Sequence, residues 1–377
     1  MNKIFFLLST LSTGGGERVA SDLSLHWPSS SLLSIVLLKN KISYPHKGNI
    51  ITLDVDESKN ILGKAYYYFL ASAKFRKLIK QEKPNYIVSF GKMPNMINLF
   101  SSDKAIVRVD NFYSASCTGF SGWVYKQLVK LFFNRAEKVV VISKESAHDI
   151  IQNFRIKKEK VKVIYNPLNI EQIRELAKES LESEHKNIFK NPVIITMGQL
   201  GRQKNQAKLI KAFQLVKKEA KNTKLVILGQ GPFENYLKSL AKELGLERDV
   251  YFLGWQKNPF KFIVRAKVFI LSSLWEGLPC SLLESMACRI PVVSFDCSSG
   301  PREILAPGTD FLKKTKSIDY TDFGALVKPK DGKLMAEAIG KILSDNNLSN
   351  RLINNSMQRA MDFEAHNIIK EWQFLKH

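Results

Sequence analysis

Two glutamates separated by seven residues, Glu276 and Glu284, are the residues of this sequence whose types and spacing most suggest chemistry. The apolar run 268–273 before them predicts a buried parallel strand, and the run 282–288 after Gly277 and Pro279 favours a helix. Ligands of open α/β sheets bind outside the carboxyl ends of the strands, where the free N–H groups of a helix N-terminus suit a phosphate. Glu284 avoids repelling that phosphate if it accepts hydrogen bonds from a neutral neighbour, such as a ribose diol.

A second candidate site lies near the N-terminus, where Gly14, Gly15 and Gly16 follow the apolar run 4–8. Glycines between a strand and a helix let the backbone approach a ligand and leave its amides available. Position 19 is a valine, so the motif is not Gly-x-Gly-x-x-Gly and a dinucleotide site is disfavoured. A tight turn without a ligand remains the alternative.

The stretch Glu-Gly-Leu-Pro…Leu-Glu at 276–284 resembles the signature of family-4 retaining glycosyltransferases of the GT-B fold. The resemblance covers nearly the whole chain and is strongest over 198–304. It implies an α/β protein with two Rossmann-like domains whose parallel sheets face each other across a cleft. The implied enzyme transfers a sugar from a nucleotide diphosphate to an acceptor hydroxyl with retention. An ordinary strand-to-helix loop with two solvated glutamates is the alternative.

The resemblance also implies roles for individual residues. Glu284 would hold the ribose hydroxyls, Glu276 would face the sugar, and Arg202 with Lys204 would stabilise the leaving diphosphate. The implied catalytic set is Glu276, Arg202, Lys204 and Asp110. The implied donor-binding set is Gly15, Gly16, Gly198, Gly229, Gly277, Leu278, Pro279, Ser281, Leu282 and Glu284.

Two positions depart from the family pattern. Gln199 stands where relatives usually carry arginine, so we expect Arg202, three residues on, to take the cationic role. Asp110 follows the predicted strand 105–109 where relatives often carry histidine, and it would orient the sugar or the acceptor hydroxyl.

Alternating strands and helices predict two parallel sheets. We expect an N-terminal domain over 1–168, a charged linker over 169–191, a C-terminal donor domain over 192–360, and a last helix over 361–377 that crosses back to the N-terminal domain. Residues 310–322 are expected to form an inserted loop. The strands are expected at 4–8, 34–38, 50–53, 86–89, 105–109, 139–142, 161–165, 192–197, 225–228, 250–253, 268–273 and 291–295.

The charge is strongly positive, +22 with a pI near 9.7, which indicates an anionic partner. A nucleic-acid-binding protein is the rival class, but zinc-site spacing, an aromatic RNA-binding motif and a basic low-complexity tail are missing from the sequence, so we expect no nucleic acid. A phosphorylase or a sugar-nucleotide epimerase of the same fold is a further rival. The four cysteines fit reduced thiols of a cytoplasmic protein. The apolar run near the N-terminus is too short for a signal peptide, and no transmembrane helix is expected.

Metal and cofactor binding are not expected. Asp54 and Asp56 mimic a metal-binding Asp-x-Asp, but other ligand residues do not cluster with them in the sequence. We interpret them as a solvated loop, and enzymes of the resembled family generally need no bound metal.

Two segments, 64–83 and 120–135, combine aromatic residues with lysines and arginines. Such helices suit an anionic membrane surface, although buried aromatic faces with a basic exterior explain them equally well. The pattern resembles transferases that extend polyprenyl-diphosphate-linked glycans, including the N-acetylgalactosaminyltransferases of bacterial N-glycosylation. The implied partners are a UDP-sugar such as UDP-GalNAc or UDP-GlcNAc and a lipid-linked glycan at the cytoplasmic face of the inner membrane. A lipopolysaccharide or capsule acceptor with another nucleotide sugar is the alternative.

Overall fold

The computed structural model describes residues 2–12, 14–55 and 61–376, which form two compact units. Unit 1 contains the described residues up to Pro167 together with those from Ala365 onward, and unit 2 contains Leu168–Glu364. Each unit is an α/β domain built on its own sheet.

Unit 1 has a sheet of seven strands in the described residues, all parallel, in the order β3-β2-β1-β4-β5-β6-β7. The strands predicted for this part are present, the one at 105–109 with the predicted bounds and the others with shifted ends. The strand predicted at 34–38, for example, begins at Ser31 and ends at Leu37. The bounds are β1 Asn2–Leu8, β2 Ser31–Leu37, β3 Asn49–Thr52, β4 Tyr86–Phe90, β5 Ala105–Val109, β6 Lys138–Val141 and β7 Val161–Val163.

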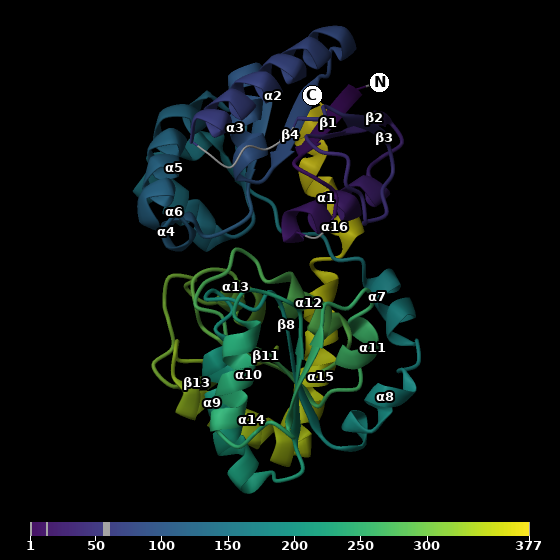
Figure 1. Cartoon of the computed structure of the whole chain (residues 1–377), viewed down its shortest axis with the longest axis vertical. Helices are drawn as coiled ribbons and strands as arrows, with labels where there is room; N and C mark the ends of the chain where they lie inside the picture. The colour runs from purple at the N-terminus through teal and green to yellow at the C-terminus, as the bar shows by residue number, and fades with distance from the viewer. Residues whose placement is uncertain (1, 13, 56–60, 377) are drawn as a thin grey trace. The chain divides into compact units, whose positions relative to one another are not determined.

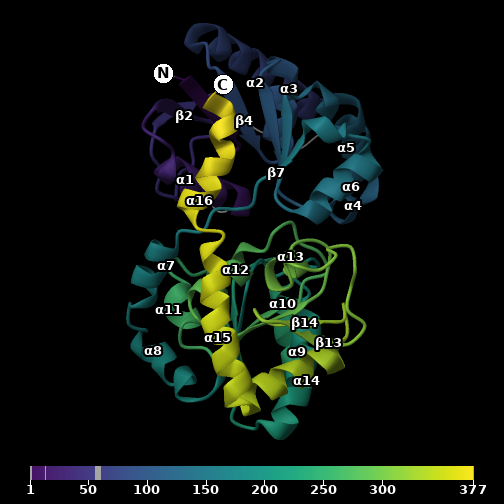
Figure 2. The ribbon, with the colours of Figure 1, turned by 180° about the vertical axis from the view of Figure 1, so that it is seen from behind.

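The helices of unit 1 cover this sheet, and the last of them comes from the C-terminus. In Figures 1 and 2 the yellow α16 lies beside the purple α1, with which it is in contact. The bounds are α1 Gly15–His26, α2 Ile61–Glu82, α3 Lys92–Ser101, α4 Tyr113–Ser116, α5 Gly119–Phe132, η1 Phe133–Arg135, α6 Lys144–Phe154, η2 Lys158–Lys160, α16 Ala365–Glu371 and η4 Trp372–Lys376.

Unit 2 has a second sheet of seven strands in the described residues, in the order β10-β9-β8-β11-β12-β14-β13. The strands are parallel except β13, which pairs antiparallel with β14. The bounds are β8 Val193–Met197, β9 Lys224–Leu228, β10 Val250–Gly254, β11 Val268–Leu271, β12 Val292–Phe295, β13 Ile318–Tyr320 and β14 Ala325–Val327.

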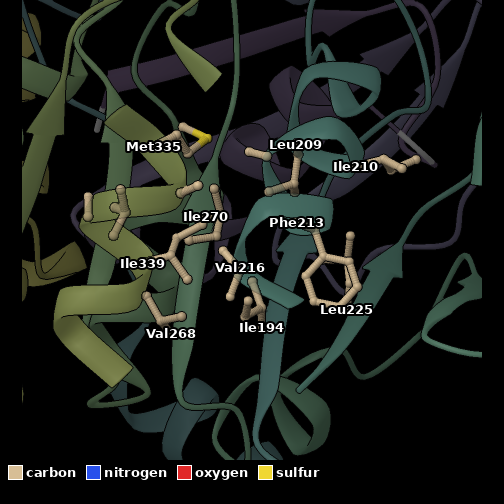
Figure 3. Packing of buried hydrophobic residues seen from close by; sticks show 14 of the residues in the cluster. Ile194, Leu209, Ile210, Phe213, Val216, Leu225, Val268, Ile270, Met335 and Ile339 are labelled. Atoms are coloured by element: carbon tan, nitrogen blue, oxygen red, sulfur yellow. The ribbon is translucent and has the colours of Figure 1, made fainter. Parts of the chain in front are cut away.

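Helices also pack on the sheet of unit 2. Figure 3 shows Leu209, Phe213 and Val216 of α9 packed with Met335 and Ile339 of α14 and with residues of the sheet, all of them buried. The bounds are α7 Ile170–Ala177, α8 Ser183–Lys186, η3 Ile188–Lys190, α9 Gln206–Glu219, α10 Glu234–Glu243, α11 Phe260–Ile263, α12 Cys280–Ala287, α13 Pro301–Leu305, α14 Gly332–Ser344 and α15 Asn346–Met361. In Figure 2 α15 runs past α12, and the two helices are in contact.

Two sequence expectations need correction. The segment 169–191 is part of unit 2 and is not a separate linker, because α7 buries Ile170, Ile173 and Ala177 and contacts α11 and α12. The segment 310–322 is not a loop throughout, because it contains β13, Ile318–Tyr320, which pairs antiparallel with β14 at the edge of the sheet. A short edge strand with mixed polarity gives little periodic signal, which explains the missed strand.

No helix in the described ranges has both the length and the apolar composition that crossing a bilayer requires.

Candidate functional site

In unit 2 the strands after β8 first continue on one side of it, as β9 and β10, and then on its other side, beginning with β11. The first candidate site lies at this topological switch point, between the neighbours β8 and β11. Ligands of open α/β sheets bind at such a point, outside the carboxyl ends of the strands. The loop 198–205 follows β8 and the loop 272–279 follows β11. Predicted donor-site residues of this unit therefore come together from two loops that are far apart in the sequence. Lys204 and Glu276, for example, are separated by 72 positions.

Lys204 and Glu276 form the central ion pair of this site, with Lys204 Nζ 2.8 Å from Glu276 Oε1. Glu276 is 5% exposed, whereas the Lys204 side chain is 21% exposed. Ser273 Oγ donates a second hydrogen bond to Oε1, and Gln203 Nε2 lies 3.5 Å from Oε2. A buried carboxylate is thus held by three donors, and the lysine among them reaches solvent.

Backbone contacts fix the loops around this pair. Leu274 N donates to Gln203 O at 2.8 Å, and Glu276 N donates to Ser298 O at 2.6 Å. Ser299 Oγ donates to Gly277 O at 3.0 Å. Three loops at the carboxyl edge of the sheet therefore hold one another, which keeps Glu276 in place.

The N-terminus of α12 lies directly after this loop. Pro279 is the N-cap residue, and Ser281 and Leu282 are in the first turn. Ser281 Oγ is buried and has no hydrogen-bond partner among the described residues, so it remains a donor for a ligand. Glu284 is the fifth residue of α12, beyond its first turn, and is 4% exposed.

Gly198 and Gly229 are needed for close backbone packing. Gly229 has φ +127°, and a Cβ there would come within 2.1 Å of Gly198 O. Gly198 lies against the stem of Lys204, whose Cε would be 3.0 Å from a Cβ at 198. These glycines support the loop that carries Lys204, whatever ligand they also touch.

Arg202 is not brought to Glu276 by any contact in the described structure. Its side chain is exposed, and it forms no ion pair with a described residue. Gln199 contributes its backbone carbonyl, which accepts from Gln206 Nε2 at 3.0 Å.

Unit 1 brings together two other predicted residues, Gly16 and Asp110. Gly15 and Gly16 are the first two residues of α1, so their amides lack intrahelical acceptors. A Cβ at Gly16 would lie 3.3 Å from Asp110 Oδ2. That oxygen is buried without a hydrogen-bond partner in the described residues.

Arg108 and Asn166 belong to this part of unit 1 and were not predicted from the sequence. Arg108, 1% exposed, donates from Nη1 to Asp110 Oδ1 and from Nη2 to Asn166 Oδ1. Its guanidinium lies 5.4 Å from the ring centre of Phe90. A single arginine in the apolar strand run Ala-Ile-Val-Arg-Val was the available signal, because a buried charge needs a partner.

No cluster of three or more histidine, cysteine, aspartate or glutamate side chains suited to a metal occurs in the part of the chain that the structure describes. Asp54 is described, whereas Asp56, its partner in the Asp-x-Asp pattern, lies outside the described residues.

The fold and the site together define a class. The structure of the Anabaena protein HepE in complex with UDP and glucose superimposes with a TM-score of 0.78 at 18% identity, over 99% of both chains. Two Rossmann-like domains in this arrangement of strands are the GT-B fold, which confirms the predicted fold class.

Sequence comparisons identify the family. Residues 13–172 match the model described as Glycosyltransferase Family 4, and residues 177–359 match Glycosyl transferases group 1. The chain is 33% identical to an uncharacterized glycosyltransferase of Methanocaldococcus jannaschii, over 86% of this chain and 87% of the relative. This chain belongs to the family-4 glycosyltransferases and is a glycosyltransferase, as the motif at 276–284 predicted.

A second relative has a more specific name. The chain is 29% identical to the N-acetylgalactosamine-N,N'-diacetylbacillosaminyl-diphospho-undecaprenol 4-alpha-N-acetylgalactosaminyltransferase of Campylobacter jejuni, over 98% of both chains.

Proposed function

We propose that this enzyme transfers an N-acetylhexosamine, GalNAc or GlcNAc, from a UDP-sugar to a hydroxyl of a polyprenyl-diphosphate-linked glycan, with retention. The observation that carries the proposal is the Lys204–Glu276 pair at the carboxyl edge of β8 and β11, beside the N-terminus of α12. The name of the Campylobacter relative supports the sugar and the lipid-linked acceptor.

The nucleotide-sugar donor is held at its diphosphate, at its ribose and at its sugar. The diphosphate lies at the N-terminus of α12, where the Ser281 hydroxyl and the first amides donate to it. Lys204 turns from Glu276 to the diphosphate, and exposed Arg202 adds a second positive charge. Glu284 accepts hydrogen bonds from the ribose hydroxyls, and Glu276 faces the sugar.

The reaction proceeds on one face of the sugar. The bond from the anomeric carbon to the β-phosphate oxygen breaks, and its electron pair leaves with UDP. The acceptor hydroxyl attacks the same face and gives its proton to the departing phosphate. Lys204, Arg202 and the helix amides stabilise the charge that develops on the diphosphate, which is the larger part of catalysis in such a step. No metal or cofactor takes part in this proposal.

Asp110 orients the sugar or the acceptor hydroxyl from unit 1. Arg108 satisfies one of its oxygens, and Oδ2 is available to accept from a hydroxyl. This carboxylate therefore takes the role that histidine has in many relatives.

Acceptor lipid implies contact with a membrane, and α5 is the surface that fits. Phe120, Trp123 and Leu131 are 79%, 57% and 68% exposed, and Phe120 stacks on Trp123. The aromatic residues of the segment 64–83 differ in exposure, because Tyr66 and Phe69 are exposed whereas Tyr67 and Phe75 are buried. We propose that α5 inserts these side chains into an anionic inner-membrane surface on the cytoplasmic side.

The test is release of UDP from a panel of UDP- and GDP-sugars, with and without lipid-linked acceptor, by wild type, Glu284→Ala and Glu276→Gln. Glu247→Gln, in an exposed turn, is the matched control. We expect acceptor-dependent release of UDP from one UDP-N-acetylhexosamine. Glu284→Ala and Glu276→Gln should lose this release, and Glu247→Gln should keep it. Turnover of GDP-sugars alone would contradict the proposed donor.

A further inference from the structure

A cavity of about 500 Å³ lies in unit 2 between α9 and the loop that joins β14 to α14. Five lysines line it, two from α9 and three from the loop and the start of α14. They are Lys208, Lys211, Lys328, Lys330 and Lys333.

The negative charge at this cavity is small. Asp331 is the acidic residue among the lining residues that the structure describes, and it caps α14 by accepting from Lys333 N and Leu334 N at 3.2 Å each. Its other oxygen lies 4.0 Å from Lys328 Nζ. The remaining four lysines form no ion pair within the described chain, so the cavity has an excess of positive charge.

The walls of the cavity are set by backbone and stem contacts. The stem of Lys208 packs on Gly332, where a Cβ would lie 3.0 Å from Lys208 Cδ. Lys328 N donates to Ser317 O at 2.9 Å, and Lys330 has a left-handed backbone with φ +64°. The loop therefore has a defined shape, while the side chains of Lys211, Lys330 and Lys333 are exposed and able to meet a ligand.

This cavity is separate from the donor site. None of its lining residues belongs to the loops 198–205 and 272–279 or to α12. The lysines in it have no part in the proposed sugar transfer.

We propose that the cavity is a second anion site, which binds a ligand carrying two or more phosphate groups. Its volume is within the range of small-molecule sites, about 300–1,000 Å³, and lysine is a flexible point charge that suits phosphate oxygens. Gathering five lysines raises the free energy of the folded unit by like-charge repulsion, and a bound polyphosphate removes that cost. The shared chemistry fits a soluble di- or triphosphate or the phosphates of lipid headgroups.

The experiment titrates inorganic diphosphate into the protein by calorimetry at low salt. Under the proposed function the donor site also accepts diphosphate, and wild type should then show two binding sites. Lys211→Gln with Lys330→Asn should lose one of them or bind there about tenfold more weakly, because charge-assisted hydrogen bonds are removed. Asparagine tolerates the left-handed backbone at position 330.

The matched control is Lys218→Gln with Lys221→Asn, which removes the same charge from exposed positions at the end of α9 and just beyond it. It should keep both sites, and all variants should keep the affinity of the wild type for UDP at the donor site. Equal titrations of the two double variants would overturn the proposal. The comparison of these variants does not require the donor site to bind diphosphate, so a failure of the proposed function leaves the result intact.

A second arm separates the two sources of phosphate. Vesicles of phosphatidylcholine and phosphatidylglycerol are sedimented with each variant, with and without diphosphate. Weaker sedimentation of the Lys211/Lys330 variant, together with competition by diphosphate, assigns the site to lipid headgroups. Equal sedimentation of all variants, with the calorimetric difference present, assigns it to a soluble phosphate.

Discussion

In unit 1 the carboxylate of Asp110 follows β5 and is held by Arg108 from the same strand, whereas in unit 2 Glu276 follows β11 and is held by Lys204 from a loop that follows β8. Both carboxylates lie at the carboxyl edge of a parallel sheet, and both are paired with a cation. The two cations differ in exposure, since the Arg108 side chain is 2% exposed and the Lys204 side chain is 21% exposed.

This difference separates a fixed pair from an exchangeable one. Arg108 has Asp110, Asn166 and the Phe90 ring around it, so its charge cannot leave without a large desolvation cost. Lys204 can leave, because Ser273 still donates to Glu276. We infer that unit 1 uses its cation to orient a carboxylate, and that unit 2 uses its cation to meet the diphosphate.

The largest effect is expected at the exchangeable pair. Lys204→Met should lower kcat for sugar transfer by about 10²–10³-fold, the usual cost of one donor to developing negative charge. The melting temperature should fall moderately, since buried Glu276 loses its cation but keeps Ser273 and Gln203 as donors. Steady-state kinetics and thermal unfolding measure the two quantities.

Lys218→Met, on an exposed position of α9, is the control for loss of a lysine. A large fall in melting temperature with a small fall in kcat would mean that the Lys204–Glu276 pair is structural, and the comparison between the units would break.

Arg108→Met tests the fixed pair. Removing one partner of a buried ion pair typically costs about 3–5 kcal/mol, and we expect the lower end because the Asp110 side chain is 22% exposed. Hydrogen exchange read by mass spectrometry should show lost protection in β5 and β6 and unchanged protection in unit 2. Loss of activity without loss of protection would mean that Arg108 acts on the substrate itself.

The sequence predicted one of these pairs better than the other. Glu276 and Lys204 lie in loops with recognisable residue types, so both were predicted, although their contact requires β8 and β11 to be neighbours in the sheet. Arg108 has no motif, and its partner Asn166 is 58 residues away. Strands were predictable from apolar runs, whereas the packing of α7 and the edge strand β13 depend on tertiary contacts that no local pattern contains.

Gly229→Ala tests how firmly the loop of Lys204 is supported. A Cβ 2.1 Å from Gly198 O, at φ +127°, forces the two backbones apart. We expect a destabilisation of about 2 kcal/mol from overpacking and backbone strain, with a raised KM for the donor as Lys204 moves.

Gly308→Ala is the matched control, because a Cβ there meets no described atom within 4 Å. Urea unfolding and donor KM are measured for both variants. Equal behaviour of the two would show that the loop adapts, and that the position of Lys204 does not depend on this packing.

The smallest effect is expected at a third carboxylate–cation pair, Glu182 with Lys261 of unit 2, which has no part in the proposed chemistry. The hydrogen bond from Lys261 is the main cause that lowers the pKa of Glu182 from 4.5 to about 2. A carboxylate with a lowered pKa in the folded state stabilises it above pH 4.5, and this contribution is lost as the pH falls from 4.5 toward 2. The Glu182 side chain is 51% exposed, so solvent screening limits the contribution to less than about 1 kcal/mol.

Glu182→Gln should therefore lower the melting temperature slightly at pH 7, and the difference from wild type should shrink as the pH is lowered toward 3. Glu184→Gln, whose side chain is 77% exposed and makes no lysine pair in the described structure, is the control. A constant difference across this pH range would mean that the Glu182–Lys261 hydrogen bond does not depend on charge. The exposed Glu182–Lys261 pair would then stabilise the folded state through its geometry alone. Exposure would in that case not be the property that distinguishes Lys204 from Arg108.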